Sequence, residues 1–427
     1  MSKLCGKLQT ALSGPTSGQV SIHIILEEQI DFDRWESDAN HKRYDLSSRQ
    51  SSLIRELKDI SQNTGNDLFR FLLDSKMVDS ESITRRWVVN AISCKADIKV
   101  VPLLAARKDV KWIGLNSQLK PTFNITETVT AMPVPDKAEK GLKAIGADLM
   151  WKLGYTGYGR LVFVPDTGTD PTHPAIARQY NGLYNGDKSS WYTQQNNSPI
   201  PKDCDRHGTH VTGTILGLDK STNDTLGVAF NARWMAGGIL CGIGSEDNLG
   251  AFEWALDPDG NPETTNDIPD VINNSWYDPE VGANECYSAY EPLLRALELA
   301  GVAVVFSAGN EGPEAGTITP PHNININIVN SFTVGALNGN VPTYPIASFS
   351  SIGPSKCPGE GSIKIKPEVS APGVQVRSCV PGNEYAFLSG TSMAAPHVSG
   401  AILLLKEAFP YLGGRELKLA LYETAID

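Results

Sequence analysis

Apolar segments of strand length alternate with segments of helical spacing along the chain from about residue 141 onward. Runs such as LVFV and VAVVF are apolar without a break, which is typical of strands buried on both faces of a parallel sheet. Helices between such strands would cover the two faces. We therefore expect an α/β fold with a doubly wound parallel sheet over residues 141–427. The predicted strands cover residues 160–166, 232–240, 270–276, 302–309 and 331–337, and the predicted helices cover residues 207–217, 248–256 and 290–301.

Residues 1–116 follow a different pattern, in which fewer strands mix with helices and charged residues are frequent. A segment of this size and mixture predicts a small α+β domain of ferredoxin-like type. Residues 117–140 are rich in Thr, Pro and polar residues and show little periodicity, which predicts a linker. The predicted strands of the N-terminal domain cover residues 18–26, 85–96 and 110–116, and its predicted helices cover residues 47–62, 65–77 and 99–109.

Composition narrows the class of protein. The chain has 427 residues, enough for two or three domains, and a formal net charge of -11, which argues against a nucleic-acid partner. No apolar run approaches the ~20 residues of a membrane-spanning helix, so no membrane partner is expected.

The N-terminus lacks the apolar core of a secretory signal, so either the protein stays inside the cell or a leader is missing from this sequence. The seven cysteines have the spacing of neither a zinc knuckle nor a dense disulfide framework, and the compartment stays open.

Polar side chains follow three of the predicted strands at the point where each strand ends. Asp166 comes after LVFVP, Asn274 after DVI, and Asn310 after VAVVFSAG. The carboxyl ends of parallel strands meet at one edge of a sheet, which is where sites form in such folds. We therefore expect these side chains to line a site.

Four segments carry the groups that acyl transfer to water requires. The reaction needs a nucleophile, a base, a carboxylate that orients the base, and a donor for the oxyanion. His207 opens a helix in RHGTHVTG, and Ser392 stands at a helix N-terminus in SGTSMAAPHVSG, where free backbone N–H groups favour negative charge. Asp166 and Asn310 would supply the carboxylate and the donor. Pro396 is expected in the first turn of the Ser392 helix, where a missing N–H costs little.

Each group alone has a simpler interpretation. Asp166 before Thr-Gly is most often a turn residue, and a histidine or serine at a helix start is most often a cap. Asn310 before Glu-Gly is ordinary loop chemistry. Together, however, the groups stand at element ends in the order Asp, His, Ser, which is one of three known chain orders for this triad. The joint pattern favours a catalytic site without any metal.

The segments PDTGTDPTHPA, HGTHVTGT, SAGNEGP and GTSMAAPHVSGA resemble the signature blocks of subtilisin-like serine proteases. PDVINNSW and IKPEVSAPGVQVRSCVPG are most similar to the bacillopeptidase F-like branch. The resemblance spans about residues 141–427 and implies that Asp166 orients the base His207, that Ser392 attacks the substrate, and that Asn310 donates to the oxyanion. It implies protein or peptide substrates and no cofactor for the chemistry.

The N-terminal domain resembles the propeptide of that branch, notably in RRWVVNAISCKADIKVVPLLAARKDVKWI. This likeness implies a zymogen whose own propeptide acts as an intramolecular inhibitor, with processing between about residues 116 and 145. The resemblance also implies residues that bind substrate. These are Gly242, Gly244, Ser275, Trp276, Ser307 and Gly309. The segment GGILCGIGSEDN that holds the first two glycines fits an edge strand and a plain turn about equally.

The sequence departs from the family pattern at several positions. Pro165 stands where an aliphatic residue is usual, and Tyr277 and Asp278 stand where glycines are frequent. The chain stops at ALYETAID, before the final segment that such domains usually carry. Cys204 is interpreted as an inert small apolar residue rather than a modulating thiol.

The loop GLDKSTNDTLGVA lies where relatives often bind calcium. Asp219, Asn223 and Asp224 in it offer oxygen ligands, so a structural calcium ion is one interpretation of the loop. A solvated acidic loop is the other and is preferred.

Two other functions are weighed against a serine endopeptidase. VFVPDTGT fits one half of an aspartic protease site, but the chain has no second Asp-Thr-Gly or Asp-Ser-Gly, so a homodimer would be needed. A non-enzymatic alternative is a pseudoprotease, or a zymogen held permanently by its N-terminal domain and used as a binding protein.

Overall fold

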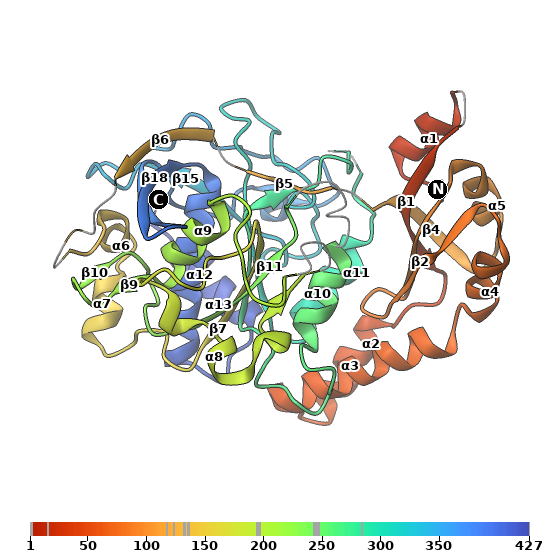
Figure 1. Ribbon diagram of the computed structural model, residues 1–427, viewed down its shortest axis with the longest axis horizontal. Coiled ribbons are helices and arrows are strands. Elements are labelled where there is room, and N and C mark those ends of the chain that lie inside the picture. Colours follow the sequence, from red (N-terminus) through yellow and green to blue (C-terminus); the bar gives the residue numbers. More distant parts are fainter. Residues whose placement is uncertain are drawn as a thin grey trace.

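The computed structural model describes residues 3–14, 17–116, 118–122, 124–130, 134, 137–193, 198–241, 248–282 and 285–426. Figure 1 shows two lobes, the N-terminal one in red and orange and the larger one in yellow to blue. Among the described residues, no helix has the length and apolar character needed to span a membrane.

The larger lobe is built on a seven-stranded sheet with the order β16-β15-β14-β12-β7-β11-β8, in which neighbouring strands run parallel. This confirms the predicted parallel α/β sheet. The strands are β7 (Leu161–Asp166), β8 (Trp191–Tyr192), β11 (Arg233–Gly238), β12 (Val271–Asn274), β14 (Ala303–Ser307), β15 (Phe332–Leu337) and β16 (Val369–Pro372). Every residue of β7 and β14 is buried, which explains their unbroken apolar sequences.

Helices cover both faces of this sheet. Because successive side chains of a strand point to opposite faces, Val162 and Phe163 of β7 lie in two different core clusters. The first cluster contains α9 (His207–Leu216), α12 (Thr391–Ala408) and α13 (Gly414–Thr424). The second contains α10 (Asn248–Leu256) and α11 (Tyr290–Leu299).

The N-terminal lobe is a four-stranded antiparallel sheet with the order β2-β3-β1-β4. The predicted strand over residues 85–96 is wrong, because residues 87–90 form a turn between two paired strands. A turn of four residues inside an apolar run leaves no gap in the hydrophobic pattern. The elements are α1 (Gly6–Leu12), β1 (Gln19–Leu26), α2 (Phe32–His41), α3 (Leu46–Asn63), α4 (Asn66–Asp74), β2 (Val78–Arg86), β3 (Ala91–Asp97), α5 (Val101–Ala105) and β4 (Val110–Leu115).

The two lobes share one apolar cluster, which joins the N-terminal sheet to α10 and α11. Polar contacts surround the shared cluster. Glu253 of α10 accepts a hydrogen bond from the backbone N–H of Val88 at 3.1 Å. Gln50 of α3 donates to the carbonyl oxygen of Ala300 at 3.0 Å, and Lys58 pairs with Asp257. The N-terminal lobe is therefore docked by both apolar and polar contacts.

The segment between the lobes is paired along much of its length. The short strand β5 (Lys120–Pro121) pairs antiparallel with β13 (Trp276–Tyr277). The strand β6 (Asn124–Thr130) pairs antiparallel with β18 (Glu384–Ser389), which itself pairs with β17 (Val376–Val380). The predicted linker is thus held against the larger lobe by backbone hydrogen bonds on two of its strands.

A buried ion pair fixes the base of the β17–β18 hairpin. The Arg377 guanidinium donates to Asp224 at 2.6 and 3.1 Å and to Glu139 at 2.9 Å. The Arg377 and Asp224 side chains are 1% and 0% exposed, so each charge depends on the other for solvation. The pair joins the hairpin to the loop after α9.

We expect Asp224→Ala to lower the melting temperature by about 5–10 °C, because removal of one partner strands a buried charge and costs about 3–5 kcal/mol. Thermal unfolding followed by circular dichroism measures the change. Asp148→Ala is the matched control, since Asp148 forms an exposed pair with Lys152 at 2.9 Å and exposed pairs contribute little. Equal melting temperatures for both variants would contradict the assigned role of the buried pair.

Candidate active site

Asp166 and His207 meet at the carboxyl edge of the sheet. Asp166 is the last residue of β7, and His207 is the first residue of α9. His207 Nδ1 lies 2.7 Å from Asp166 Oδ1, and the two residues are 1% and 0% exposed. Since the carboxylate can only accept, Nδ1 carries the proton and the other ring nitrogen, Nε2, is left to act as a base.

Neighbouring groups fix the Asp166 carboxylate and, behind it, a second carboxylate. The backbone N–H of Thr167 donates to Asp166 Oδ1 at 2.7 Å, while the Thr167 hydroxyl donates to Asp203 Oδ1 at 2.7 Å. Asp203 in turn accepts from the backbone N–H of Thr209 at 2.8 Å on α9. Asp203 is not among the site residues predicted from the sequence, where its only signal is a carboxylate four residues before His207.

Burial and charge act in opposite directions on the pKa values at this pair. Burial lowers the pKa of His207, but the charge of Asp166 and its hydrogen bond raise it, and the pKa ends above its ordinary value. Burial raises the pKa of Asp203 to about 6, although hydrogen bonds from Thr209 and Thr167 lower it. Because the effect of Asp166 outweighs the effect of burial, the His207 imidazole takes up a proton more readily than a histidine side chain with an unshifted pKa.

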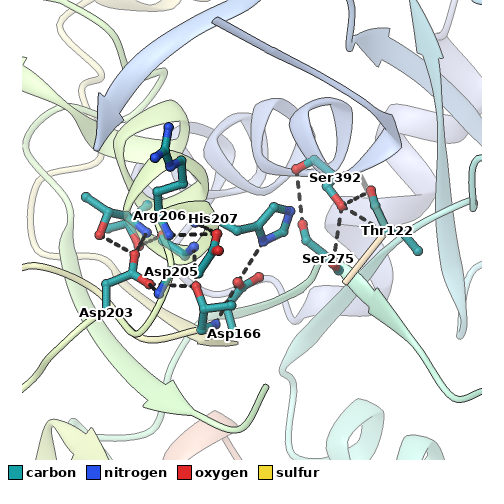
Figure 2. A network of polar contacts seen from close by, with 12 residues as sticks. Thr122, Asp166, Asp203, Asp205, Arg206, His207, Ser275 and Ser392 are labelled. Carbon is teal, nitrogen blue, oxygen red and sulfur yellow. Dashed lines mark hydrogen bonds and ion pairs between the residues drawn. The ribbon is translucent and has the colours of Figure 1, made fainter. Parts of the chain in front are cut away.

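Ser392 lies in the first turn of α12, and Figure 2 shows the His207 imidazole between Asp166 and Ser392. The prediction that Pro396 falls in this first turn is wrong, because α12 begins at Thr391 and Pro396 lies inside the helix. There its missing N–H leaves the Ser392 carbonyl without the usual helical donor. The Ser275 hydroxyl donates to that carbonyl instead, at 3.1 Å.

A glycine of α12 also lets this helix lie close against a neighbouring helix. At Gly400, an added Cβ would lie 2.4 Å from Val228 Cβ and 3.1 Å from the Ile215 carbonyl oxygen of α9. This glycine therefore permits contact with α9 and the loop after it.

Asn310 faces the same edge with its amide orientation fixed. Its Oδ1 accepts from the Thr391 backbone N–H at 2.9 Å and from the Thr391 hydroxyl at 3.0 Å. Its Nδ2 is buried and has no hydrogen-bond partner among the residues that the structure describes. The donor end of the side chain is thus available at the start of α12.

A peptide strand from the same chain occupies the site. The backbone N–H of Thr122 donates to the Ser275 carbonyl oxygen at 3.1 Å, and the Ser392 hydroxyl donates to the Thr122 carbonyl oxygen. Figure 2 shows Thr122 beside Ser392 on the side away from His207. Thr122 is not among the site residues predicted from the sequence, where it carries no signal beyond its position in the predicted linker.

The chain is similar in sequence to known proteins. The profile of the subtilase family, Peptidase S8, matches residues 157–427. The chain belongs to the subtilase family. Bacillopeptidase F of Bacillus subtilis (strain 168) is 34% identical over 402 residues, which cover 88% of this chain and 27% of that protein. Subtilisin NAT of Bacillus subtilis subsp. natto is 31% identical over 285 residues, covering 67% of this chain and 65% of that protein. The match thus spans about a quarter of Bacillopeptidase F.

Four of the six residues that the subtilase resemblance implies for substrate binding lie among the described residues. Ser275, Ser307 and Gly309 are buried or tightly held at the same edge, and Ser307 ends β14. Trp276 presents its backbone to Pro121 in the β5–β13 pair, while its ring is 0% exposed and packs near Phe306. Gly242 and Gly244 lie outside the described residues.

The interpretation of Cys204 as an inert apolar residue is wrong. Cys204 forms a disulfide with Cys241, which lies three residues beyond the end of β11. The Cys204 backbone N–H also donates to the Thr167 carbonyl oxygen at 2.9 Å. A separation of 37 residues gave no spacing signal, because only the fold brings the two loops together. A second disulfide joins Cys286 and Cys357.

The acidic loop after α9 is not solvated at its two carboxylates. Asp219 and Asp224 are 4% and 0% exposed. Asp219 accepts from the Tyr385 hydroxyl at 3.1 Å, and both Asp224 oxygens accept from Arg377. A calcium ion coordinated by Asp224 would have to displace the Arg377 cation, so these contacts do not fit the calcium site considered from the sequence.

The cysteine pairing predicts a defined alkylation pattern. In the folded, non-reduced protein, iodoacetamide should leave Cys5, Cys94 and Cys379 unmodified, because all are buried and burial raises the pKa of Cys94 and Cys379 to about 12. Denaturation without reductant should expose these three residues to alkylation. Peptide mass spectrometry reads the pattern, and alkylation of Cys204 or Cys241 before reduction would contradict the assigned disulfide.

Proposed function

We propose that this protein is a serine endopeptidase, made as a zymogen, that hydrolyses peptide bonds in proteins or peptides. The proposal rests on one observation above all. The Ser392 hydroxyl contacts the carbonyl oxygen of a peptide strand, beside the buried Asp166–His207 pair. Membership of the subtilase family supports the same reaction, and the names of Bacillopeptidase F and Subtilisin NAT describe peptidases.

In this mechanism, Ser392 Oγ bonds to the carbonyl carbon of the substrate while His207 Nε2 takes the hydroxyl proton. Asp166 holds the ring with Nε2 free to accept and stabilises the imidazolium that forms. The C–N bond then breaks, and His207 gives the proton to the leaving amine. Water attacks the acyl-enzyme by the same route and returns Ser392 to its starting form.

Two donors are placed to stabilise the oxyanion of the tetrahedral intermediate. One is the backbone N–H of Ser392, which as part of the first turn of α12 has no intrahelical acceptor. The other is Asn310 Nδ2, which is directed by the two hydrogen bonds that Thr391 makes to Asn310 Oδ1. Donors fixed in advance cost no reorganisation when charge develops.

Two features support an autoinhibited precursor. The N-terminal lobe shares an apolar cluster with α10 and α11, and the segment that leaves it passes through the site. Pairing to β13 on one side of Thr122 and to β18 on the other resembles the way an extended peptide adds to sheet edges. A substrate in solution would have to displace this intramolecular strand, so the intact chain should be inactive toward it.

Covalent labelling with a fluorophosphonate tests both parts of the proposal. We expect little label on the intact chain and label on Ser392 after limited proteolysis of residues 1–140, located by peptide mass spectrometry. His207→Ala should abolish it, whereas Ser399→Ala should keep it, since Ser399 lies on the same helix and contacts Asn273 at 2.8 Å. Absence of label before and after proteolysis would support the pseudoprotease alternative.

Asn310→Ala should slow turnover of the processed enzyme by about 10²–10³-fold in kcat while KM changes little, as for loss of a subtilisin oxyanion donor. The missing donor matters only once charge develops on the substrate oxygen. Steady-state kinetics on a peptide substrate, with active sites counted by fluorophosphonate titration, measures the effect. An unchanged kcat would remove Asn310 from the mechanism.

A further inference from the structure

The Thr122 side chain is held as closely as its backbone. Thr122 is 4% exposed, and its Oγ1 lies 2.7 Å from Ser392 Oγ and within hydrogen-bonding distance of Ser307 Oγ. Since the Ser392 hydroxyl donates to the Thr122 carbonyl oxygen, Thr122 Oγ1 donates to Ser392 Oγ and accepts from Ser307. The three hydroxyls form one continuous chain of donors and acceptors.

The backbone register identifies which residue is presented to the nucleophile. Before Thr122, Lys120 and Pro121 pair with Tyr277 and Trp276, and after it Asn124 pairs with Ser389. The Thr122 carbonyl lies between these two antiparallel pairings and is the one that Ser392 contacts. The bond on the carboxyl side of Thr122 is therefore the one offered for attack.

Ser307 is an unusual choice at the end of an apolar strand. The preceding residues of β14 are AVVF, and Ser307 is 0% exposed. The alternative acceptor for the Ser307 hydroxyl proton, the Asn274 carbonyl oxygen, lies 3.5 Å away, so a hydrogen bond to it would be weak. The shorter hydrogen bond of the Ser307 hydroxyl is thus the one to the Thr122 side chain. An apolar residue at position 122 would leave this buried hydroxyl with only the weak acceptor.

We propose that Ser307 is a specificity-determining residue that selects a hydroxyl side chain, Thr or Ser, on the residue whose carbonyl is attacked, and that the chain first cuts itself on the carboxyl side of Thr122. This inference rests on the proposed function. A site built to hydrogen-bond a substrate hydroxyl discriminates against the isostere that lacks it, because buried polar groups are then left unpaired. Thr and Val are such a pair.

The reaction at Thr122 needs no co-reactant other than water. Ser392 Oγ bonds to the Thr122 carbonyl carbon, and its proton passes through His207 to the amine of residue 123 as the C–N bond breaks. Water then releases Thr122 as a free carboxylate. The products are a fragment that ends at Thr122 and a chain that begins at residue 123.

A double-mutant cycle in the full-length protein isolates the hydroxyl contact. In the native background, Thr122→Val should slow self-cleavage after residue 122 by about threefold to tenfold, the range for one hydrogen bond, and Thr122→Ser should keep the rate. In the Ser307→Ala background, Val and Thr at residue 122 should be cut at rates within about twofold of each other. Rates and fragment ends are read by mass spectrometry.

Controls separate this inference from the proposed function. Ser399→Ala removes another buried hydroxyl, and in it Thr122→Val should still slow cleavage threefold to tenfold. A Thr-to-Val ratio that Ser307→Ala leaves unchanged, or a first cut elsewhere by an active enzyme, overturns the specificity inference while the proposed function stands. A chain in which Ser392 never labels with fluorophosphonate and never cuts itself overturns both.

The same preference should appear on added substrates. Two peptides that differ only by Thr or Val before the cleaved bond should differ about threefold to tenfold in kcat/KM with the processed protein. Equal values would overturn the substrate class, even if the chain cuts itself after Thr122.

Discussion

A hydrogen bond between two almost fully buried groups, Asp166 and His207, imposes the constraint that the rest of the site satisfies. A carboxylate without solvent is tolerated only where donors surround it. The Thr167 N–H and the His207 ring supply donors to Asp166 Oδ1, and both come from segments that the sheet edge brings together. Asp203 adds a second, half-buried carboxylate, which connects the Thr167 hydroxyl to α9. The imidazole has little freedom to rotate, so its second nitrogen stays directed at Ser392.

The nucleophile is fixed by a different device. Pro396 removes the helical donor for the Ser392 carbonyl, and Ser275 fills that place. Because Ser275 also accepts the backbone N–H of Thr122, one residue connects the start of α12 with the peptide strand in the site. A shift of the bound peptide would therefore also shift Ser275 and, through its hydrogen bond, the Ser392 backbone. The base is thus held by β7 and α9, and the nucleophile by α12 and Ser275, and the two helices pack against each other at Gly400.

The same chain supplies both the site and the strand that fills it. Docking of the N-terminal lobe on α10 and α11 keeps the local concentration of that strand high, so a substrate in solution competes with an intramolecular ligand. The Thr122 hydroxyl is buried between the hydroxyls of Ser307 and Ser392, so this strand makes side-chain contacts in the site as well as backbone contacts. The contacts that hold Thr122 in the site are those that a substrate with a threonine or serine before the cleaved bond would make.

The sequence by itself determined the elements with strong local signals. The unbroken apolar strands, the helices that begin near His207 and Ser392, and the family blocks could all be recognised in short windows of the sequence. A strand buried on both sheet faces is apolar at successive positions, so its signal lies within a few residues. The turn at residues 87–90 was lost because a hairpin inside an apolar run looks like one strand. Only the tertiary structure decided the Cys204–Cys241 bond, the pairing of Asp224 with Arg377 across 153 residues, and the place of Thr122 at Ser392 across 270. These contacts join segments far apart in the chain, and nothing in either segment's own pattern specifies its partner. They exist only once the sheet edge has brought the loops within reach.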